Sequence, residues 1–272
     1  MWSDLEANEE NRQPYQEGVA IPNVIKKVAV LFDGAGLARL GLEQAGLHCT
    51  GFELNKIAHY LSSHVGSGNC VLADVRSVDL SEFDAVWASP PCQLNSVART
   101  QGSPESEFSA DFLDWCLKLP VETLWVENVV TPGATWGKTW NAAQFTREPL
   151  QNRNRVIGGS HPEPDTFREY QKAFPGVCPT IMATEYKGCA SDPRRASRFY
   201  GRRLTVDECA YHQGFEIPKV WWYNPFGLED AEWEHSLYTA VGNGVPVYMA
   251  RAFGKAYAED DNSLDFLGGL LK

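Results

Sequence analysis

A cysteine that follows two prolines is the residue best suited to chemistry in this sequence, in the segment Pro90-Pro91-Cys92-Gln93. Consecutive prolines stiffen the backbone, so the segment predicts an exposed turn instead of a place inside an apolar run. A cysteine thiolate is a strong nucleophile when the pKa of the thiol is lowered. We therefore interpret Cys92 as a catalytic nucleophile with a lowered thiol pKa. Inert packing is the interpretation for three other cysteines, Cys49, Cys70 and Cys116.

A carboxylate and two arginines are placed to assist such a nucleophile. Glu127 directly follows the apolar run Leu124-Trp125-Val126, which predicts a buried strand. An acid at this position could donate a proton or a hydrogen bond to a ring that the thiolate attacks. Arg153 and Arg155 alternate along an extended segment, so both should point one way, toward Glu127 and the ring. The plainer alternatives are a strand cap for Glu127 and a surface pair for the arginines.

Strands and helices alternate along the part of the chain that holds these residues. Alternation of this kind predicts an α/β fold with a mostly parallel sheet covered on both faces. Ligands bind at the carboxyl ends of the strands in such sheets. A polar or reactive residue follows each of five expected strands: Asp33, Glu53, Asp74, Cys92 and Glu127. These strands are 28–32, 49–52, 71–73, 85–88 and 123–126.

Further elements are expected around this alternating core. Thr205 and Glu208 have the spacing of a capping box at the start of a helix. The aromatic run 221–223 is expected to pack against the core or a lobe junction. Two more strands are expected at 142–145 and 156–157, and helices at 37–45, 57–64, 108–119, 204–213 and 245–258.

The first strand leads into a glycine turn that suits an adenosine ligand. In Gly34-Ala35-Gly36, backbone N–H groups and the start of the next helix can approach a ligand closely. Glu53 at the end of the second strand suits a ribose diol. A dinucleotide site would carry a third glycine where this chain has Arg39, which favours another adenosine ligand. S-adenosylmethionine fits, with Asp74 as a hydrogen-bond acceptor for the adenine amino group.

The order of the motifs resembles that of the DNA (cytosine-5) methyltransferase family, from Val28 to Ala258. The series as a whole, more than any single segment, carries the resemblance. It implies a Rossmann-like class I S-adenosylmethionine-dependent methyltransferase fold with a small target-recognition lobe. The matching segments are Phe32-Asp33-Gly34-Ala35-Gly36, Glu53, Asp74, Pro90-Pro91-Cys92-Gln93, Glu127-Asn128-Val129, Gln151-Asn152-Arg153-Asn154-Arg155, Arg203-Leu204-Thr205 with Glu208, Gln213-Gly214-Phe215 and Gly242-Asn243-Gly244-Val245-Pro246.

The family transfers a methyl group to carbon 5 of cytosine. The resemblance implies that the Cys92 thiolate adds to carbon 6, that Glu127 is the partner of ring N3, and that Arg153 and Arg155 support the base. Addition at carbon 6 turns the ring into an enamine, whose carbon 5 can attack a sulfonium methyl group. The implied partner is duplex DNA with the cytosine flipped out, as is general for methyltransferases that modify bases.

The resemblance also implies where the cofactor and the DNA bind. The basic cluster at 187–203 would hold phosphates, although a solvated loop is its plainer alternative. S-adenosylmethionine would contact Phe32, Asp33, Gly34, Ala35, Gly36, Glu53, Leu54, Asp74, Val75, Pro90, Asn243 and Val245. DNA would contact Gln93, Ser96, Lys187, Arg194, Arg195, Arg198, Arg202 and Arg203.

The expected recognition region is short, since only 48 residues lie between Arg155 and Leu204. A lobe of this size offers few base contacts and predicts a short or relaxed recognition site. The sequence also departs from the family pattern at Leu94-Asn95-Ser96 and at Leu37, and its compact form is similar to that of phage-encoded members. We expect an extension at 1–24, a catalytic domain at 25–158 and 204–258, a recognition region at 159–203 and an acidic tail at 259–272.

Composition limits the partners and the compartment. A net charge of −11 argues against nucleic acid when taken alone, and the basic cluster opposes it locally. No segment approaches the ~20 apolar residues of a membrane helix, and the acidic start is unlike a signal peptide. Seven irregularly spaced cysteines predict reduced thiols and no metal site. We expect a monomer in the cytoplasm of a bacterial or phage-infected cell, without membrane contact, in a restriction-modification or phage setting.

Three alternatives share the motifs. The same chemistry could act on RNA, as in the transfer-RNA methylating branch of the family. A larger group could be transferred from a modified sulfonium cofactor. A non-catalytic DNA-binding decoy could use the same scaffold, although retention of Cys92, Glu127, Arg153 and Arg155 opposes this.

Overall fold

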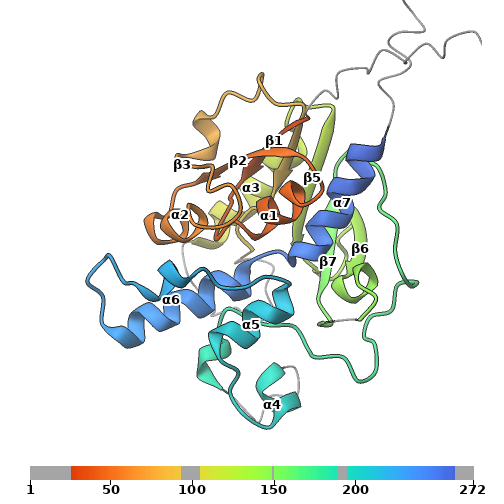
Figure 1. The fold of residues 1–272 in the computed structure, drawn as a ribbon. Coiled ribbons are helices and arrows are strands. Elements are labelled where there is room, and N and C mark those ends of the chain that lie inside the picture. The colour runs from red at the N-terminus through yellow and green to blue at the C-terminus, as the bar shows by residue number, and fades with distance from the viewer. Residues whose placement is uncertain (1–25, 93–104, 149, 189–194, 261–272) are drawn as a thin grey trace, which may run out of the picture.

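The computed structural model describes residues 26–92, 105–148, 150–188 and 195–260 (Figure 1). Its centre is a seven-stranded sheet with the strand order β3-β2-β1-β4-β5-β7-β6. The first five strands run parallel, and β7 lies antiparallel between β5 and β6. This confirms the predicted mostly parallel sheet. The strands are β1 Lys27–Leu31, β2 His48–Glu53, β3 Cys70–Leu72, β4 Ala85–Ala88, β5 Thr123–Val129, β6 Gly137–Asn141 and β7 Asn154–Gly158.

The strand order reverses between β1 and β4, which is the usual ligand-binding position of such sheets. Leu31 of β1 is paired with Phe52 on one side and with Ala88 on the other. Ala88 is in turn paired with Val126 of β5. The segments that follow these strands therefore begin side by side at one edge of the sheet, where the predicted site residues lie.

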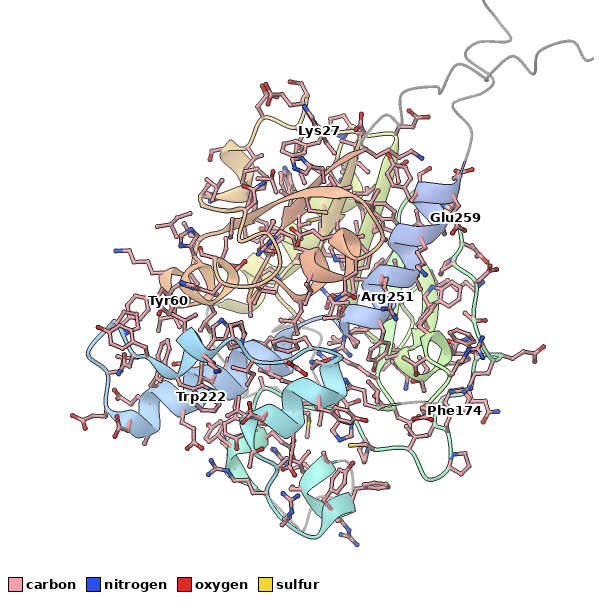
Figure 2. The ribbon with its side chains drawn as sticks, in the orientation of Figure 1. Lys27, Tyr60, Phe174, Trp222, Arg251 and Glu259 are labelled. Carbon is pink, nitrogen blue, oxygen red and sulfur yellow. The ribbon has the colours of Figure 1, made fainter. Side chains whose placement is uncertain are left out.

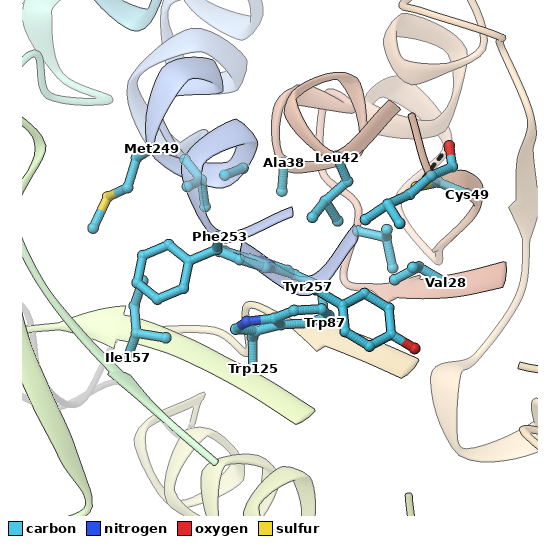
Figure 3. Close-up of a cluster of buried hydrophobic side chains, with 14 of the residues drawn as sticks. Val28, Ala38, Leu42, Cys49, Trp87, Trp125, Ile157, Met249, Phe253 and Tyr257 are labelled. Atoms are coloured by element: carbon cyan, nitrogen blue, oxygen red, sulfur yellow. Dashed lines mark hydrogen bonds between the residues drawn. The ribbon is translucent and has the colours of Figure 1, made fainter. Parts of the chain in front are cut away.

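Helices cover both faces of the sheet because both faces of its central strands are apolar. Alternate residues of β1 belong to different buried clusters, as expected for a parallel strand. On one face, Trp87 and Trp125 pack beside Phe253 of α7 (Figure 3). On the other, Phe112 and Cys116 of α3 are buried. The covering helices are α1 Leu37–Glu43, α3 Glu105–Leu117 and α7 Val247–Glu259.

A third apolar cluster lies beyond the carboxyl edge of the sheet, where α2, α5 and α6 meet (Figure 1). Trp233 donates its indole N–H to the Trp221 carbonyl, and Trp221 donates to the Leu61 carbonyl, both at 2.9 Å. Trp222 and Tyr223 are 50% and 68% exposed, so the expected packing of the aromatic run is right only for Trp221 (Figure 2). The elements are α2 Lys56–Ser62, η1 Val75–Ser77, η3 Glu185–Lys187, α4 Ala196–Tyr200, α5 Val206–Gln213, η4 Lys219–Trp222 and α6 Asp230–Asn243. No helix in these described segments is long and apolar enough to cross a membrane.

The strand predicted at 142–145 is wrong, because these residues form the 3-10 turn η2 (Ala142–Phe145) directly after β6. The Asn141 side chain accepts a hydrogen bond from the Ala143 N–H at 3.1 Å. The Gln144 side chain accepts one from the Asn141 N–H at 2.8 Å. Such side-chain bonds satisfy backbone groups that would otherwise continue a sheet ladder. The helix α6 is also absent from the sequence-based expectation.

The capping box predicted at the start of α5 is confirmed. The Glu208 N–H donates to the Thr205 hydroxyl at 3.2 Å, and the Thr205 N–H donates to the Glu208 carboxylate at 2.8 Å. We expect Thr205→Ala to lower the free energy of unfolding by about 1 kcal/mol, because the helix loses its cap. Urea unfolding followed by circular dichroism measures the change. Thr205→Ser keeps the hydroxyl and should lose less than about 0.5 kcal/mol, so equal losses in both variants would contradict the capping role.

Candidate active site

Cys92 lies just beyond β4, in the turn that begins with the two prolines. The Pro90 carbonyl accepts a hydrogen bond from the Asn128 side-chain amide at 3.1 Å. Because Asn128 belongs to β5, this bond ties the turn to the neighbouring strand. Cys92 itself is half-buried. The sequence contains Asn128 within a matching motif, but its action as the anchor of the cysteine turn emerges only from the structure.

Glu127 and Arg155 form a largely buried ion pair next to this turn. The Arg155 Nε lies 2.8 Å from the Glu127 Oε1, and the two side chains are 12% and 8% exposed. The pairing of β5 with β7 brings them together, since Val129 lies opposite Arg155. The expected contact between Glu127 and this arginine is therefore present. A carboxyl group held by a guanidinium group can present an acid and a positive charge to the same edge of a bound ring.

Arg153 makes different contacts from those expected. Its guanidinium group is buried and donates to the carbonyls of Ile181, Gly242 and Gly244 at 2.6, 2.8 and 3.0 Å. In the described part of the chain, none of its hydrogen bonds goes to Glu127, although the Glu127 charge raises the pKa of Arg153. Carbonyls near a helix end lack partners within the helix, which makes them good acceptors for a buried cation. Burial lowers the pKa of Arg153 to about 9.

The electrostatic surroundings of Cys92 do not lower its pKa in the resting protein. Burial raises the pKa of the thiol, the Arg155 charge lowers it and the Glu127 charge raises it again. The expectation of a lowered pKa is therefore wrong for this state. The physical reason is that desolvation of a thiolate outweighs two nearby guanidinium groups when a carboxylate stands beside them.

The glycine turn after β1 holds the carboxylate that ends β2. The Gly34 N–H donates to Glu53 Oε2 at 2.8 Å, and the Asn55 N–H donates to Oε1 at 2.7 Å. Gly34 and Gly36 have φ values of 60° and 83°, in the left-handed region that favours glycine. Each carboxylate oxygen keeps a second lone pair, so Glu53 can still accept hydrogen bonds from a ligand.

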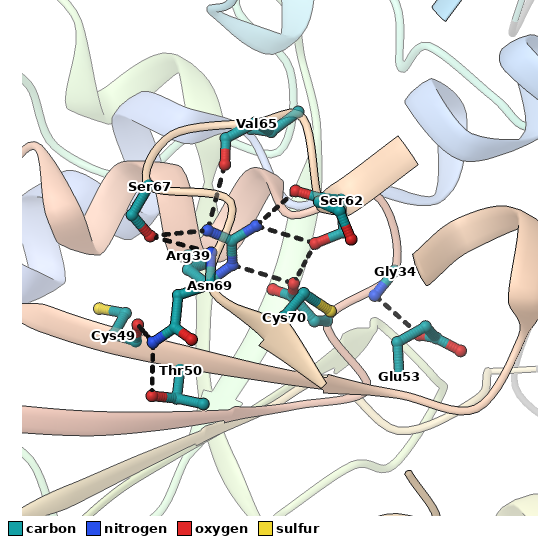
Figure 4. A network of polar contacts seen from close by, with 12 residues as sticks. Gly34, Arg39, Cys49, Thr50, Glu53, Ser62, Val65, Ser67, Asn69 and Cys70 are labelled. Carbon is teal, nitrogen blue, oxygen red and sulfur yellow. Dashed lines mark hydrogen bonds and ion pairs between the residues drawn. The ribbon is translucent and has the colours of Figure 1, made fainter. Parts of the chain in front are cut away.

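A buried network of polar side chains lies beneath this turn. The sequence pattern did not indicate it, because Arg39 was notable there only as a departure from a glycine pattern. Arg39 Nε donates to Asp33 Oδ2 at 3.0 Å, and the Ser62 hydroxyl donates to the same oxygen (Figure 4). The guanidinium group also reaches the Ser62 and Val65 carbonyls at 2.7 and 3.1 Å. A side chain at Gly51 would stand 2.2 Å from the Asp33 carboxylate, so β2 needs glycine there. Asp33 Oδ2 thus faces the network, and Oδ1 is buried without a hydrogen-bond partner among the described residues.

Other expected cofactor residues lie around the same edge. Asp74 caps η1 and pairs with Arg76 at 2.6 Å, and hydrogen bonds from Arg76 lower the pKa of Asp74 to about 2. Its carboxylate therefore already has a cationic partner. Leu54 is 64% exposed and Val75 is buried, while the Phe32 ring packs edge-on against Phe112. Ala35 and Pro90 are buried, Asn243 is exposed at the end of α6, and Val245 is buried.

The last of the family motifs, at 242–246, is held by the side-chain amides of Gln151 and Gln213, which belong to two other motifs. Gln213 donates to the carbonyls of Val241 and Gly244 at 2.6 and 3.1 Å. Gln151 donates to Gln213 at 2.9 Å and accepts a hydrogen bond from the Ile181 N–H at 3.1 Å. Together with Arg153, these side chains join the sheet edge to the second lobe, the part of the molecule beyond that edge that holds α4, α5 and α6.

The basic cluster is largely engaged within the protein. Arg202 binds Glu208, and Arg203 binds Glu234 and the Tyr238 hydroxyl. Arg195 donates to the Thr184 carbonyl at 2.8 Å, whereas Lys187 and Arg198 are exposed. Gln93, Ser96 and Arg194, also expected to contact DNA, lie outside the described residues.

The groups around the glycine turn fit S-adenosylmethionine. Glu53 offers carboxylate lone pairs, and a Cβ on Gly34 would meet nothing closer than the Phe32 carbonyl at 4.0 Å. The turn thus leaves open space beside its backbone, next to an acceptor suited to a ribose. Within the described residues, no group of three His, Cys, Asp or Glu side chains is arranged to hold a metal ion.

Solved structures with the same fold include the Dnmt2 methyltransferase of S. pombe, with a TM-score of 0.53 and 14% identity over 87% of this chain and 99% of that chain. The Entamoeba histolytica methyltransferase EhMeth gives a TM-score of 0.52 and 16% identity over 87% and 98%. A putative DNA modification methyltransferase encoded within an E. coli prophage gives 0.50 and 13% over 85% and 98%. Curated protein sequences contain no match.

The fold is the Rossmann-like fold of class I S-adenosylmethionine-dependent methyltransferases. The family model for C-5 cytosine-specific DNA methylases matches residues 27–131 and 121–259. These matches span most of the chain, and the chain belongs to the C-5 cytosine-specific DNA methylase family.

Proposed function

We propose that this protein transfers a methyl group from S-adenosylmethionine to carbon 5 of cytosine in DNA, with Cys92 as the nucleophile. The buried pair of Glu127 and Arg155, 2.8 Å apart beside the cysteine turn, is the observation that carries this function. A nucleophile, an acid and a fixed positive charge at one strand edge are what addition to a pyrimidine ring requires.

In the first step, the Cys92 thiol loses its proton to solvent, and the resulting thiolate forms a bond from Sγ to carbon 6 of the cytosine. The electron pair of the C5–C6 double bond moves to C4–C5, and the C4–N3 pair moves to N3. Glu127, which takes up a proton from solvent when the base binds, donates that proton to N3 and returns to the carboxylate form, which Arg155 stabilises. Charge is therefore neutralised at the ring as it develops.

S-adenosylmethionine supplies an electrophilic methyl group when it is bound, and Glu53 with the backbone of Gly34 would hold it. After carbon 5 has been methylated, its proton leaves to solvent and the bond between carbon 6 and Sγ breaks. The N3 proton returns to Glu127, and the thiolate and the aromatic ring are restored. The cytosine must lie outside a base stack throughout, because Cys92 reaches carbon 6 only from the face of the ring.

A trapping experiment tests the mechanism. DNA that contains 5-fluorocytosine has no proton to lose from carbon 5, so the adduct persists after methyl transfer. We expect a denaturant-resistant complex with the wild type and none with Cys92→Ala, detected as a mass increase. Cys116→Ala changes a cysteine of α3, a helix that covers one face of the sheet, and should trap normally. No adduct with the wild type, or an undiminished adduct with Cys92→Ala, would overturn the mechanism.

The substrate and the domain assignment are part of the same proposal. We assign catalysis to 25–158 and 204–258 and contact with DNA to 159–203. A methylation assay that compares DNA with transfer RNA tests the substrate, and mass spectrometry of the product base tests the transferred group. Faster methylation of transfer RNA would replace DNA as the substrate.

A further inference from the structure

Three exposed aromatic side chains lie on the second lobe. Phe199 and Tyr200 end α4, and Tyr211 belongs to α5; they are 48%, 43% and 61% exposed. The rings of Phe199 and Tyr200 meet edge to face at 5.1 Å, and His212 lies 5.7 Å from Tyr200 and 5.5 Å from Tyr211. We call Phe199, Tyr200 and Tyr211 the aromatic patch. Apolar rings gathered on a surface usually mark a binding site.

Hydrogen bonds hold the centre of the aromatic patch in place. His212 Nδ1 must donate to the Leu150 carbonyl, because a carbonyl can only accept. Burial lowers the pKa of His212, so the ring is neutral near pH 7 and its Nε2 is an acceptor. The Tyr200 hydroxyl therefore donates to Nε2 at 3.0 Å. A ring fixed in this way loses little conformational entropy when a flat ligand stacks on it.

Arginines lie in the same segment of the chain as two rings of the aromatic patch. Residues 195–203 contain four arginines and no acidic residue, and Arg198 is exposed directly before Phe199. Aromatic rings beside guanidinium groups are the combination with which proteins bind single-stranded nucleic acid, because every base has a face that can stack.

A continuous duplex fits this surface poorly. Bases in a duplex are stacked on one another and present only their edges in the grooves, so they offer no free face to the aromatic patch. Duplex affinity comes mainly from cations that neutralise phosphates. Here Arg202 is paired with Glu208 and Arg203 with Glu234. These two arginines are therefore engaged with carboxylates and are poorly placed to neutralise phosphates. The exposed aromatic rings of this lobe are better placed to stack on a base.

The aromatic patch is connected to the candidate active site. His212 bonds to Leu150, which begins the segment that leads to Arg155. Five residue steps span at most about 18 Å of extended chain. The aromatic patch is thus joined to the strand edge that carries Arg155 through one short segment of the chain.

We propose, on the basis of the proposed function, that the aromatic patch stacks an unpaired base of the single-stranded DNA that carries the target cytosine. The substrate is then DNA that is single-stranded or looped around its target, in preference to a continuous duplex.

Binding of a fluorescent 12-nucleotide DNA strand, measured by anisotropy, tests this inference. We expect the strand to bind at least about tenfold more tightly than the same sequence as a duplex, and no less tightly than the same sequence as an RNA strand. Loss of one stacked base corresponds to a five- to hundredfold loss, so Phe199→Ala and Tyr211→Ala should weaken strand binding by about that factor. Tyr211→Phe keeps the ring and should bind as the wild type does. Tyr223→Ala removes a 68% exposed ring outside the patch and should change nothing.

Other results of the binding and trapping experiments would each contradict one part of the inference or the proposed function. Equal or tighter binding of the duplex, or unchanged binding by both alanine variants with unchanged melting temperatures, would overturn the stacking role. Tighter binding of the RNA strand would overturn single-stranded DNA as the partner. These results leave the 5-fluorocytosine adduct intact, whereas failure of that adduct on every DNA form overturns the proposed function and leaves the binding preference measurable.

Discussion

Glu127→Gln is expected to slow methyl transfer by about two to four orders of magnitude while making Cys92 more reactive toward iodoacetamide. The amide cannot give a proton to ring N3, so the addition loses its acid. The carboxylate charge also raises the pKa of Cys92, and its removal should lower that pKa. Single-turnover methylation measures the first effect. The pH profile of alkylation measures the second, because only the thiolate reacts.

The direction in which the pH profile of alkylation shifts distinguishes an electrostatic effect on Cys92 from a general disruption of the fold. In the wild type, burial raises the pKa of Cys92, so the alkylation rate should keep rising above pH ~8.5, the ordinary thiol value. The profile should move to lower pH in Glu127→Gln. It should move to higher pH in Arg155→Gln, because the Arg155 charge lowers the same pKa. Shifts of the same sign in both variants, or methyl transfer within tenfold of the wild type in Glu127→Gln, would contradict these roles.

Arg39→Met is expected to lower the free energy of unfolding by about 3–5 kcal/mol, the usual loss when one partner of a buried ion pair is removed. The Arg39 and Asp33 side chains are both fully buried, 3.0 Å apart. Burial raises the pKa of Asp33, and the Arg39 charge opposes that rise. Without Arg39, the carboxyl group must lose its charge or stay buried without a cation. Urea unfolding measures the loss.

A double variant shows whether the loss comes from the pair. Arg39→Met with Asp33→Asn leaves no buried charge, so it should be more stable than the sum of the single losses predicts, with a coupling of at least about 1 kcal/mol. Additive losses would indicate that Arg39 acts through packing and its carbonyl contacts alone. A single-variant loss below about 1 kcal/mol would contradict the importance of the network.

The positions of Glu53, Cys92 and Glu127 were predictable because they depend on local pattern and on one topological rule. Each residue follows or ends an apolar strand in the sequence, and parallel strands bring their carboxyl ends to one edge. The observed pairings of Leu31 with Phe52 and Ala88, and of Ala88 with Val126, place all three there.

The contacts made by the arginines were not predictable in the same way. Alternation predicts that Arg153 and Arg155 share a face, yet Arg155 binds Glu127 and Arg153 binds carbonyls of Ile181, Gly242 and Gly244. Those carbonyls come from segments far away in the chain. The partners of Arg202 and Arg203 are likewise set by the packing of α5 and α6.

By itself, the sequence determined the α/β class, the order of the motifs and the residues at the strand ends, because hydrophobic period and turn chemistry act over a few neighbouring residues. Only the tertiary structure decided that Asp33 is turned into a network with Arg39, that Cys92 has a raised pKa, and that three aromatic rings face outward on the second lobe. Burial, charge and exposure depend on which distant segments pack around a side chain. The pattern of neighbouring residues in a sequence does not show which distant segments these are.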